Sequence, residues 1–263
     1  MRNWVNQGES LGAEADLDYS YRLLRAVQSG VLEAPLIRVY RPEPTVSFGQ
    51  QDTRMPGFAA AQDRAREHGF VPAVRRAGGR AAAYHRGSLV VDHCFPVADG
   101  DDSFSGFRER FEHYADRFAA LLRRLGADAR VGEIPGEYCP GEFSVHARRS
   151  RSNGKIKIIG TAQRVTKGAW LFSSSLVIED SAPIRAVLTD VYDALELELN
   201  PATAGAADDA AEGITVESVV EALLADELAE AHLVPEPEPG LHTLDFAELL
   251  DRVPRDLTQE VER

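Results

Sequence analysis

The stretch that decides the fold is Lys155-Ile-Lys-Ile-Ile-Gly-Thr-Ala-Gln-Arg164. Its first four residues alternate between polar and apolar, and 155–159 is predicted to be a β-strand. Lys155 and Lys157 are two positions apart, so a regular strand places them on one face. With Lys167 they are all the lysines of the chain, and every other basic residue is arginine. A compositional bias of the genome explains why lysine is scarce in this chain, but it does not explain why the three lysines cluster.

Working outward, Phe143-Ser-Val-His146 and 155–159 are predicted to form a hairpin across a polar loop, and 169–178 a further strand. Apolar periodicity predicts the remaining elements. The strands are 36–40, 45–48, 71–76, 88–95 and 129–131, and the helices are 13–30, 57–69, 104–126, 184–199 and 216–231. Residues 200–213 are predicted to be a flexible connection. The expected fold is α/β (α+β), a single domain with a mixed β-sheet flanked by helices.

The bulk composition is that of a soluble globular protein of 263 residues, with 44% hydrophobic and 27% charged residues. Residues 1–234 are expected to form one domain, and 235–263 a short C-terminal tail that is too small for a core of its own. The net charge of −13 argues against nucleic-acid partners. The absence of a long apolar segment argues against a membrane protein. Two cysteines fit a reducing compartment, so a cytoplasmic location is expected.

The turn Arg75-Arg-Ala-Gly-Gly-Arg-Ala-Ala-Ala-Tyr-His85 follows a predicted strand. Paired glycines let the backbone approach a ligand closely, and arginines supply forked donors for a carboxylate, a carbonyl or a phosphate. His85 is a candidate base or donor. A structural hairpin without a ligand explains the glycines equally well. The spacing matches neither a Walker A loop nor a dinucleotide-binding fingerprint.

Cys139 lies in a glycine-rich turn, between Tyr138 and Pro140, which is a poor place for a packed core cysteine. Nearby cations favour the thiolate, so Cys139 is a candidate nucleophile, although a structural role is the commoner one. Cys94 lies in an apolar run and is expected to be buried and inert. Five arginine and lysine side chains lie between 146 and 157. They predict either a binding surface for an anionic partner or a loop exposed to solvent. The scattered histidines indicate no metal site.

These segments together resemble the lipoate–protein ligase and octanoyltransferase superfamily, which is related to biotin–protein ligase. Three motifs carry the resemblance: Pro44-Thr-Val-Ser-Phe-Gly49, Arg75-Arg-Ala-Gly-Gly-Arg-Ala-Ala-Ala-Tyr-His85 and Lys157-Ile-Ile-Gly-Thr-Ala-Gln-Arg164. They occur in the order and spacing of that family, over roughly residues 15–230. The resemblance implies a biotin/lipoate ligase-like catalytic domain over 1–234, without a separate accessory domain in 235–263.

The resemblance implies an enzyme that attaches a lipoyl or octanoyl group to the acceptor lysine of a carrier. The carriers would be lipoyl domains of 2-oxoacid dehydrogenases or the glycine cleavage H protein. Lys157 would be the essential lysine that stabilises developing negative charge. The substrate-binding residues would be Arg75, Gly78, Gly79, Arg80, His85, Gly160, Thr161 and Ala162.

Two departures from the family leave the acyl donor open. Gly141-Glu-Phe-Ser144 lacks the Asn-Asp pair of ATP-dependent ligases, and Arg86 stands where relatives often have Asp. One alternative is a ligase that uses ATP and Mg, with its accessory domain on another chain. The second is a cofactor-free octanoyltransferase that takes the acyl group from acyl carrier protein through Cys139. The third is a non-catalytic member that binds lipoate, an acyl-adenylate or a carrier.

Overall fold

The computed structural model describes residues 2–32, 35–97, 102–231 and 240–258. The core of the fold is an eight-stranded sheet in the order β11-β1-β2-β6-β10-β9-β8-β7, beside a three-stranded sheet in the order β4-β3-β5. The strands are β1 (Arg2–Glu9), β2 (Leu36–Arg41), β3 (Thr45–Phe48), β4 (Val71–Val74), β5 (Ala82–Tyr84), β6 (Ser88–Pro96), β7 (Ala129–Val131), β8 (Val145–Arg148), β9 (Lys155–Thr166), β10 (Ala169–Val177) and β11 (Leu241–Thr243).

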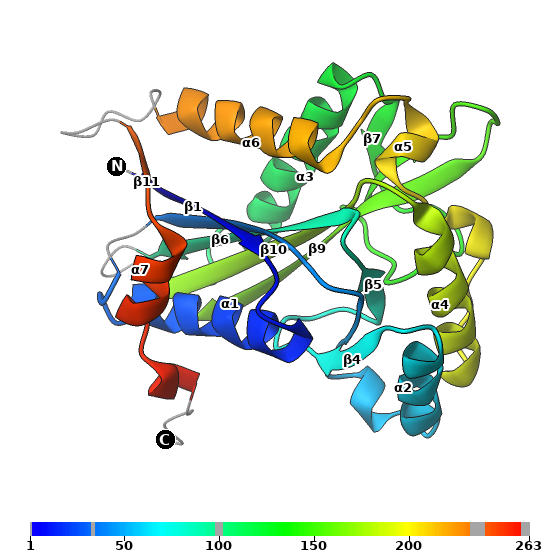
Figure 1. Ribbon diagram of the computed structural model, residues 1–263, viewed down its shortest axis with the longest axis horizontal. Coiled ribbons are helices and arrows are strands. Elements are labelled where there is room, and N and C mark those ends of the chain that lie inside the picture. Colours follow the sequence, from blue (N-terminus) through cyan, green and yellow to red (C-terminus); the bar gives the residue numbers. More distant parts are fainter. Residues whose placement is uncertain (1, 33–34, 98–101, 232–239, 259–263) are drawn as a thin grey trace.

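Helices cover both faces of the large sheet (Figure 1). The helices are α1 (Ala13–Gln28), α2 (Phe58–Glu67), α3 (Phe107–Arg124), α4 (Ser181–Ala194), α5 (Ala207–Ala210), α6 (Val216–Ala231) and α7 (Phe246–Arg252). In Figure 1, α3 and α6 lie on one face, α1 lies on the other, and α2 and α4 lie beside the small sheet. Strands β1, β2 and β11 pair in parallel, whereas β2, β6, β10, β9, β8 and β7 pair antiparallel. The mixed sheet with flanking helices is therefore confirmed.

The apolar stripe of α3 is buried only in part. Tyr114, Phe118 and Leu122 pack into the main core beneath the helix, as their spacing predicts. Phe104 and Phe107, which belong to the same predicted stripe, are exposed by 63% and 44%. The helix begins at Phe107 and not at residue 104, so the first turn of the predicted helix lies outside the packed face.

Strand β9 is more than twice as long as predicted and extends through Gly160 to Thr166. It pairs with β10 over residues 159–166 but with β8 only over 155–159. Among the described residues, no strand pairs with the β8-side edge of β9 beyond Ile159. Two turns, one before β8 and one between β4 and β5, approach this open edge, and the candidate site forms there.

Residues 200–213 are not the flexible connection that their composition predicts. They form a 3₁₀ turn at Pro201–Thr203 and the short helix α5. Ala204, Ala206 and Ala207 are completely buried, because their small side chains let the backbone pack directly against the core. Helix α4 likewise begins at Ser181, three residues before its predicted start, and ends at Ala194.

The segment after residue 240 packs onto the main body. Strand β11 extends the large sheet by pairing in parallel with β1. Leu249 and Val253 are buried in a cluster with residues of α1. The proline-rich segment and the boundary expected at 234–235 lie outside the described residues. Within the described part of the chain, no helix combines the length and apolarity needed to cross a bilayer.

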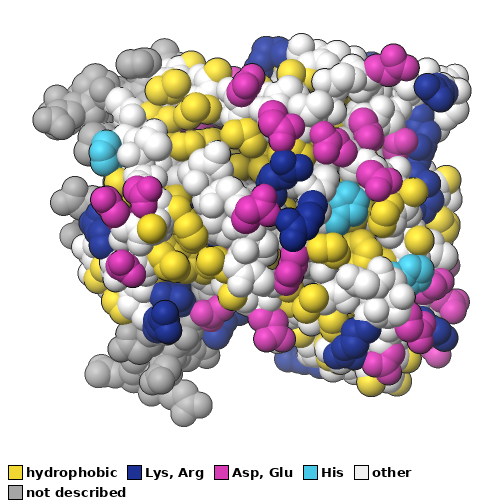
Figure 2. Space-filling model, in the orientation of Figure 1, with side chains coloured by type: hydrophobic (Ala, Val, Ile, Leu, Met, Phe, Trp, Pro, Cys, Tyr) yellow, Lys and Arg dark blue, Asp and Glu magenta, His cyan; other side chains and the backbone are white. Residues whose placement is uncertain are grey.

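A buried charge cluster joins α1 to the sheet. The guanidinium of Arg38 on β2 is fully buried and pairs with Asp16 at 2.6 Å and with Asp92 at 3.1 Å. Ser20 donates a hydrogen bond to the same Asp92 oxygen. Because an unpaired buried charge costs several kcal/mol, this cluster holds α1 in one position. On the outside, acidic and basic side chains are interspersed over the face seen in Figure 2.

Candidate active site

Two cavities meet at the open edge of β9. The α1-side cavity lies between α1, the small sheet and strands β9 and β10, and the α3-side cavity lies between the start of α3 and the turn before β8. Cys139, Thr161 and Ala162 line both cavities. The α1-side cavity is also lined by Leu17, Ser20, Tyr21, Tyr40, Ser47, Arg75, Arg76, Ala77, Ala82, Tyr84, Val90, Tyr138, Gly160, Arg164, Leu171, Ser173 and Ser175.

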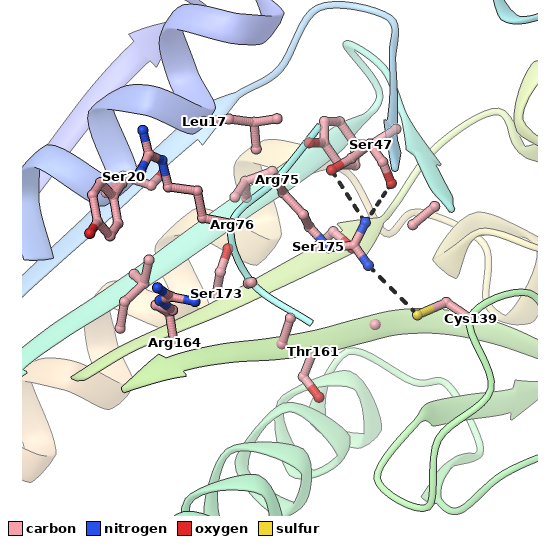
Figure 3. Close-up of a pocket in the computed structure, with 18 of the residues that line it drawn as sticks. Leu17, Ser20, Ser47, Arg75, Arg76, Cys139, Thr161, Arg164, Ser173 and Ser175 are labelled. Atoms are coloured by element: carbon pink, nitrogen blue, oxygen red, sulfur yellow. Dashed lines mark hydrogen bonds between the residues drawn. The ribbon is translucent and has the colours of Figure 1, made fainter. Parts of the chain in front are cut away.

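The α1-side cavity has largely apolar and aromatic walls. Its lining follows β9 from Gly160 to Arg164, five residues that span about 13 Å in a strand. In Figure 3, Cys139 stands at one end of this cavity, and Arg76 and Arg164 stand at the other. An apolar lining that extends this far along a strand suits an extended aliphatic chain whose reactive end lies at the thiol.

The β4–β5 turn forms one wall at the thiol, and close packing requires glycine within it and at a position beside it. Gly79 has φ +97°, and a Cβ there would lie 2.8 Å from the Sγ of Cys139. A Cβ on Gly49, just after β3, would lie 1.8 Å from the carbonyl oxygen of Gly79. The guanidinium of Arg75 donates to the carbonyl oxygens of Ser47, Gly78 and Arg80 and so holds the turn in this shape.

Cys139 is held in a strained backbone conformation with φ 41°, which few non-glycine residues adopt. Its N–H donates to the hydroxyl of Tyr192 at 2.6 Å, and that hydroxyl donates to the carbonyl oxygen of Ala81. Its Sγ accepts the backbone N–H of Arg80 at 3.3 Å and lies 4.0 Å from Nη2 of Arg75 (Figure 3). The strain and these donors present the sulfur to both cavities.

Lys157 is buried beneath Cys139, with 1% of its side chain exposed. Its Nζ donates to the carbonyl oxygens of Cys139 at 2.7 Å and Tyr138 at 3.0 Å. Nζ also lies 3.3 Å from Oε1 of Glu137 and 4.9 Å from the centre of the Tyr138 ring. Lys157 lines the α3-side cavity, so its charge lies close to any group bound beside the thiol.

The family model of the Lipoyl protein ligase A/B catalytic domain matches residues 13–226, most of the chain. The chain belongs to this family. An octanoyl-GcvH:protein N-octanoyltransferase of Exiguobacterium sibiricum is 31% identical over 170 residues, and one of Geobacillus kaustophilus is 31% identical over 166. Each match covers 63% of this chain, and they cover 57% and 55% of the relatives. The chain thus matches less than two thirds of the length of these curated relatives.

Solved structures of lipoate–protein ligases share the fold. A lipoate-protein ligase A bound with ATP superposes with a TM-score of 0.69 at 20% identity, covering 96% of this chain and 93% of that one. A putative lipoate protein ligase of Thermoplasma acidophilum with bound lipoic acid superposes with a TM-score of 0.66 at 21% identity, covering 96% and 93%. These comparisons confirm the predicted lipoate ligase-like architecture.

Most of the family-motif residues come together at the cavities. Gly78 and Gly79 line the α3-side cavity, Gly160 and Arg75 the α1-side cavity, and Thr161 and Ala162 both. Arg80 contributes its backbone N–H to the thiol, whereas its side chain turns away to Asp52 and Met55. The guanidinium of Arg75 was expected to bind a ligand. In the structure it donates to backbone carbonyl oxygens of its own turn.

The structure does not bring His85, a predicted substrate-binding residue, to either cavity. The N–H of Gly87 donates to Nδ1 at 2.8 Å, so Nε2 carries the proton and donates to the carbonyl oxygen of Asp180 at 2.9 Å. With both ring nitrogens used in this way, His85 ties the end of β5 to the start of α4.

The basic run between 146 and 157 pairs largely with acids on the protein itself. Arg149 pairs with Asp209, and Arg151 lies 3.7 Å from Glu212. Of this run only Lys157 lines a cavity. Within the described ranges, no cluster of three histidine, cysteine or acidic side chains is arranged to hold a metal ion. Burial raises the pKa of the Cys94 thiol, in keeping with the inert core position predicted for it.

Sequence reasoning missed three residues that shape the site: Glu137, Tyr138 and Tyr192. Tyr138 and Tyr192 are almost fully buried, and burial raises the pKa of each hydroxyl. Both therefore remain protonated, and Tyr192 can donate to Ala81 while it accepts from Cys139. The contacts of Tyr192 join segments 53 and 111 residues apart, and no local spacing predicts them.

Proposed function

We propose that this chain is an acyltransferase that moves an octanoyl or lipoyl group onto the acceptor lysine of a lipoyl carrier domain. Cys139 is its nucleophile and Lys157 its electrostatic catalyst. The observation that carries the proposal is the position of Cys139, which lines a largely apolar cavity and a second cavity at once. An acyl group held in the first cavity presents its carbonyl carbon at the sulfur, and its partner approaches through the second.

The reaction proceeds in two transfers. The Cys139 thiolate attacks the carbonyl carbon of a thioester donor, the donor's C–S bond breaks, and the leaving thiolate takes up a proton. The neutral amine of the acceptor lysine then attacks the acyl-Cys139 carbonyl, an amide forms, and the Cys139 sulfur leaves with its bonding electrons. The amine proton is released, so Cys139 ends the cycle as it began.

The environment of Cys139 supports this role. The Arg80 N–H at 3.3 Å and the guanidinium of Arg75 at 4.0 Å stabilise negative charge on the sulfur. Each tetrahedral intermediate carries an oxyanion near the sulfur. The ammonium of Lys157, 2.7 Å from the carbonyl oxygen of Cys139, lies close enough to stabilise that charge.

A thioester donor fits the α3-side cavity better than ATP does. The charged side chains that line this cavity are Arg108, Glu142 and Lys157. Arg108 already forms two hydrogen bonds to Glu142, and Lys157 donates into the 137–139 turn. Aromatic side chains of Phe107, Phe111 and Phe143 supply much of the remaining wall, which suits a largely uncharged pantetheine arm.

The expected carriers follow from the relatives. The octanoyltransferases are named for an octanoyl group on GcvH, and one structural relative is described as part of a lipoylation system of Thermoplasma acidophilum, a bi-partite lipoate protein ligase and its E2 lipoyl domain. We propose lipoyl domains of 2-oxoacid dehydrogenases or the glycine cleavage H protein as acceptor, and an acylated GcvH or acyl carrier protein as donor.

Intact-mass spectrometry tests the function. The protein is incubated with octanoyl-acyl carrier protein or octanoyl-GcvH, and separately with lipoate and MgATP, each with and without an apo-lipoyl domain. We expect one octanoyl group on Cys139 and its later appearance on the domain. A product formed only with MgATP would identify a ligase. Ligand binding by calorimetry without any product would identify a non-catalytic binding protein.

A further inference from the structure

Glu137 is buried directly behind the nucleophile, with 2% of the residue exposed, and the proposed mechanism does not yet use it. It lines neither cavity, so it does not touch an acyl group or its carrier. Its Oε1 accepts hydrogen bonds from the hydroxyl of Ser144, the N–H of Gly141 and Nζ of Lys157. Any effect of Glu137 on the reaction must therefore pass through Lys157 or through the turn that holds Cys139.

The ammonium of Lys157 has three N–H groups, and the structure supplies three acceptors for them. The carbonyl oxygens of Cys139 and Tyr138 lie at 2.7 and 3.0 Å, and Oε1 of Glu137 lies at 3.3 Å. To donate to an oxyanion beside Cys139, Lys157 must give up one of these bonds. The bond to Glu137 is the longest of the three, and its oxygen keeps two other donors after Lys157 leaves.

We propose that Glu137 is a positioning residue that acts through Lys157. Its carboxylate neutralises the buried ammonium and holds it against the Cys139 turn. During acyl transfer, the oxyanion replaces Oε1 of Glu137 as the third acceptor. This inference rests on the proposed acyltransferase function and assigns a role to a residue that no motif contains.

The first test separates kcat from KM. Glu137→Gln removes the charge at constant size, and Glu137→Asp keeps the charge but withdraws it from Nζ. We expect both variants to lower kcat for octanoyl transfer by about tenfold or more, with the KM of the donor changed less than about threefold. Glu133→Gln makes the same chemical change at an exposed glutamate that lines neither cavity, so it is the matched control and retains kcat within about threefold.

The second test is a double-mutant cycle with Lys157→Met, measured as single-turnover acylation of Cys139. If Glu137 acts through Lys157, Glu137→Gln changes the rate less than about twofold once Lys157 is gone. Equal effects in both backgrounds, or an unchanged kcat in the two single variants, would overturn the proposal. If Glu137→Gln does not fold because Lys157 is left unpaired, Glu137→Asp and the double variant still decide the question.

The wild-type protein distinguishes this inference from the function on which it rests. If wild-type Cys139 is never acylated by an octanoyl thioester, the proposed function fails whatever Glu137 does. If wild-type Cys139 is acylated but the Glu137 and Lys157 effects multiply independently, only the positioning role fails.

Discussion

Lys155 and Lys157 lie two positions apart on β9, yet their surroundings differ completely. Lys155 is exposed at the start of the strand, whereas Lys157 is buried beneath Cys139. The strand passes from solvent into the site within these two residues. Of the two ammonium groups that the sequence offers on one face, only that of Lys157 reaches Cys139.

This difference makes Lys155 a matched control for Lys157. Lys157→Met is expected to lower the rate of octanoyl transfer by about 100- to 1000-fold, because it removes the charge that stabilises the oxyanion. Lys155→Met is expected to leave the rate within about twofold. Steady-state transfer to an apo-lipoyl domain measures both, and equal losses in the two variants would contradict the assignment.

The residues of the site divide into those that motifs predict and those that they do not. Lys157 and Gly79 were predicted from motifs, and the structure places both against Cys139. Tyr192 and Glu137 were not, because each acts by joining segments that meet only in the folded chain. His85 belongs to a motif yet serves the fold, since its ring binds backbone groups alone.

At the scale of elements, the β4–β5 turn packs against the sulfur of Cys139. A Cβ added at Gly78 would meet nothing within 4 Å beyond its immediate chain neighbours. Gly79 has positive φ, and a Cβ there would lie 2.7 Å from Nη2 of Arg75 and 2.8 Å from Sγ of Cys139. The two neighbouring glycines therefore differ sharply in what a side chain would meet. The turn is close-packed against the thiol at Gly79 only.

Gly79→Ala is accordingly expected to lower the rate of Cys139 acylation by at least about tenfold. It should also reduce the free energy of unfolding by about 1–2 kcal/mol, because alanine is strained at this φ. Gly78→Ala should leave the acylation rate within about threefold. Single-turnover mass spectrometry and urea unfolding measure the two effects, and a tolerant Gly79 would argue against a close-packed turn.

Other elements show where local patterns lose their predictive power. The continuation of β9 through Gly160-Thr-Ala162 has no apolar alternation, and its pairing with β10 alone holds it extended. The alanines at 204, 206 and 207 look like a linker by composition, but tertiary packing buries them. In both cases distant contacts, not local propensity, determine the structure.

At the scale of the whole molecule, an ion-pair cluster fastens α6 to α3 and β1. Arg2 and Arg117 each pair with Glu230, and Arg117 also pairs with Glu227. The hydrogen bond from His113, aided by Arg2 and Arg117, outweighs partial burial and lowers the pKa of Glu230 to about 2. A carboxyl with a lowered pKa stabilises the folded state above its ordinary pKa and loses that effect as the pH falls.

The free energy of unfolding should therefore decrease between about pH 4.5 and pH 2 as Glu230 becomes protonated. Glu230→Gln should be less stable than the wild type at about pH 6, and its stability should depend less on pH over that interval. Glu221→Gln, at an exposed position of the same helix, is the control. Urea midpoints measured at several pH values test this, and parallel pH curves for wild type and Glu230→Gln would contradict it.

The edge of the large sheet was the part of the whole fold that sequence patterns anticipated least. Strand β1 is mostly polar, and β11 has only three residues, so neither has a strong strand signal. Their pairing brings together two segments that lie far apart in the chain. The β8–β9 hairpin was predictable because its strands are neighbours in the sequence, whereas β6 pairs with β10 and β2 across much longer separations.

The most direct test of acyl transfer through Cys139 is a chase experiment. The octanoylated protein is formed, freed of donor, and mixed with an apo-lipoyl domain while the intact masses of both are followed. We predict that the octanoyl group leaves Cys139 as it appears on the acceptor lysine, and that Cys139→Ser abolishes transfer whereas Cys94→Ser does not. An octanoyl group that stays on the protein, or a Cys139→Ser variant that still transfers it, would contradict the account.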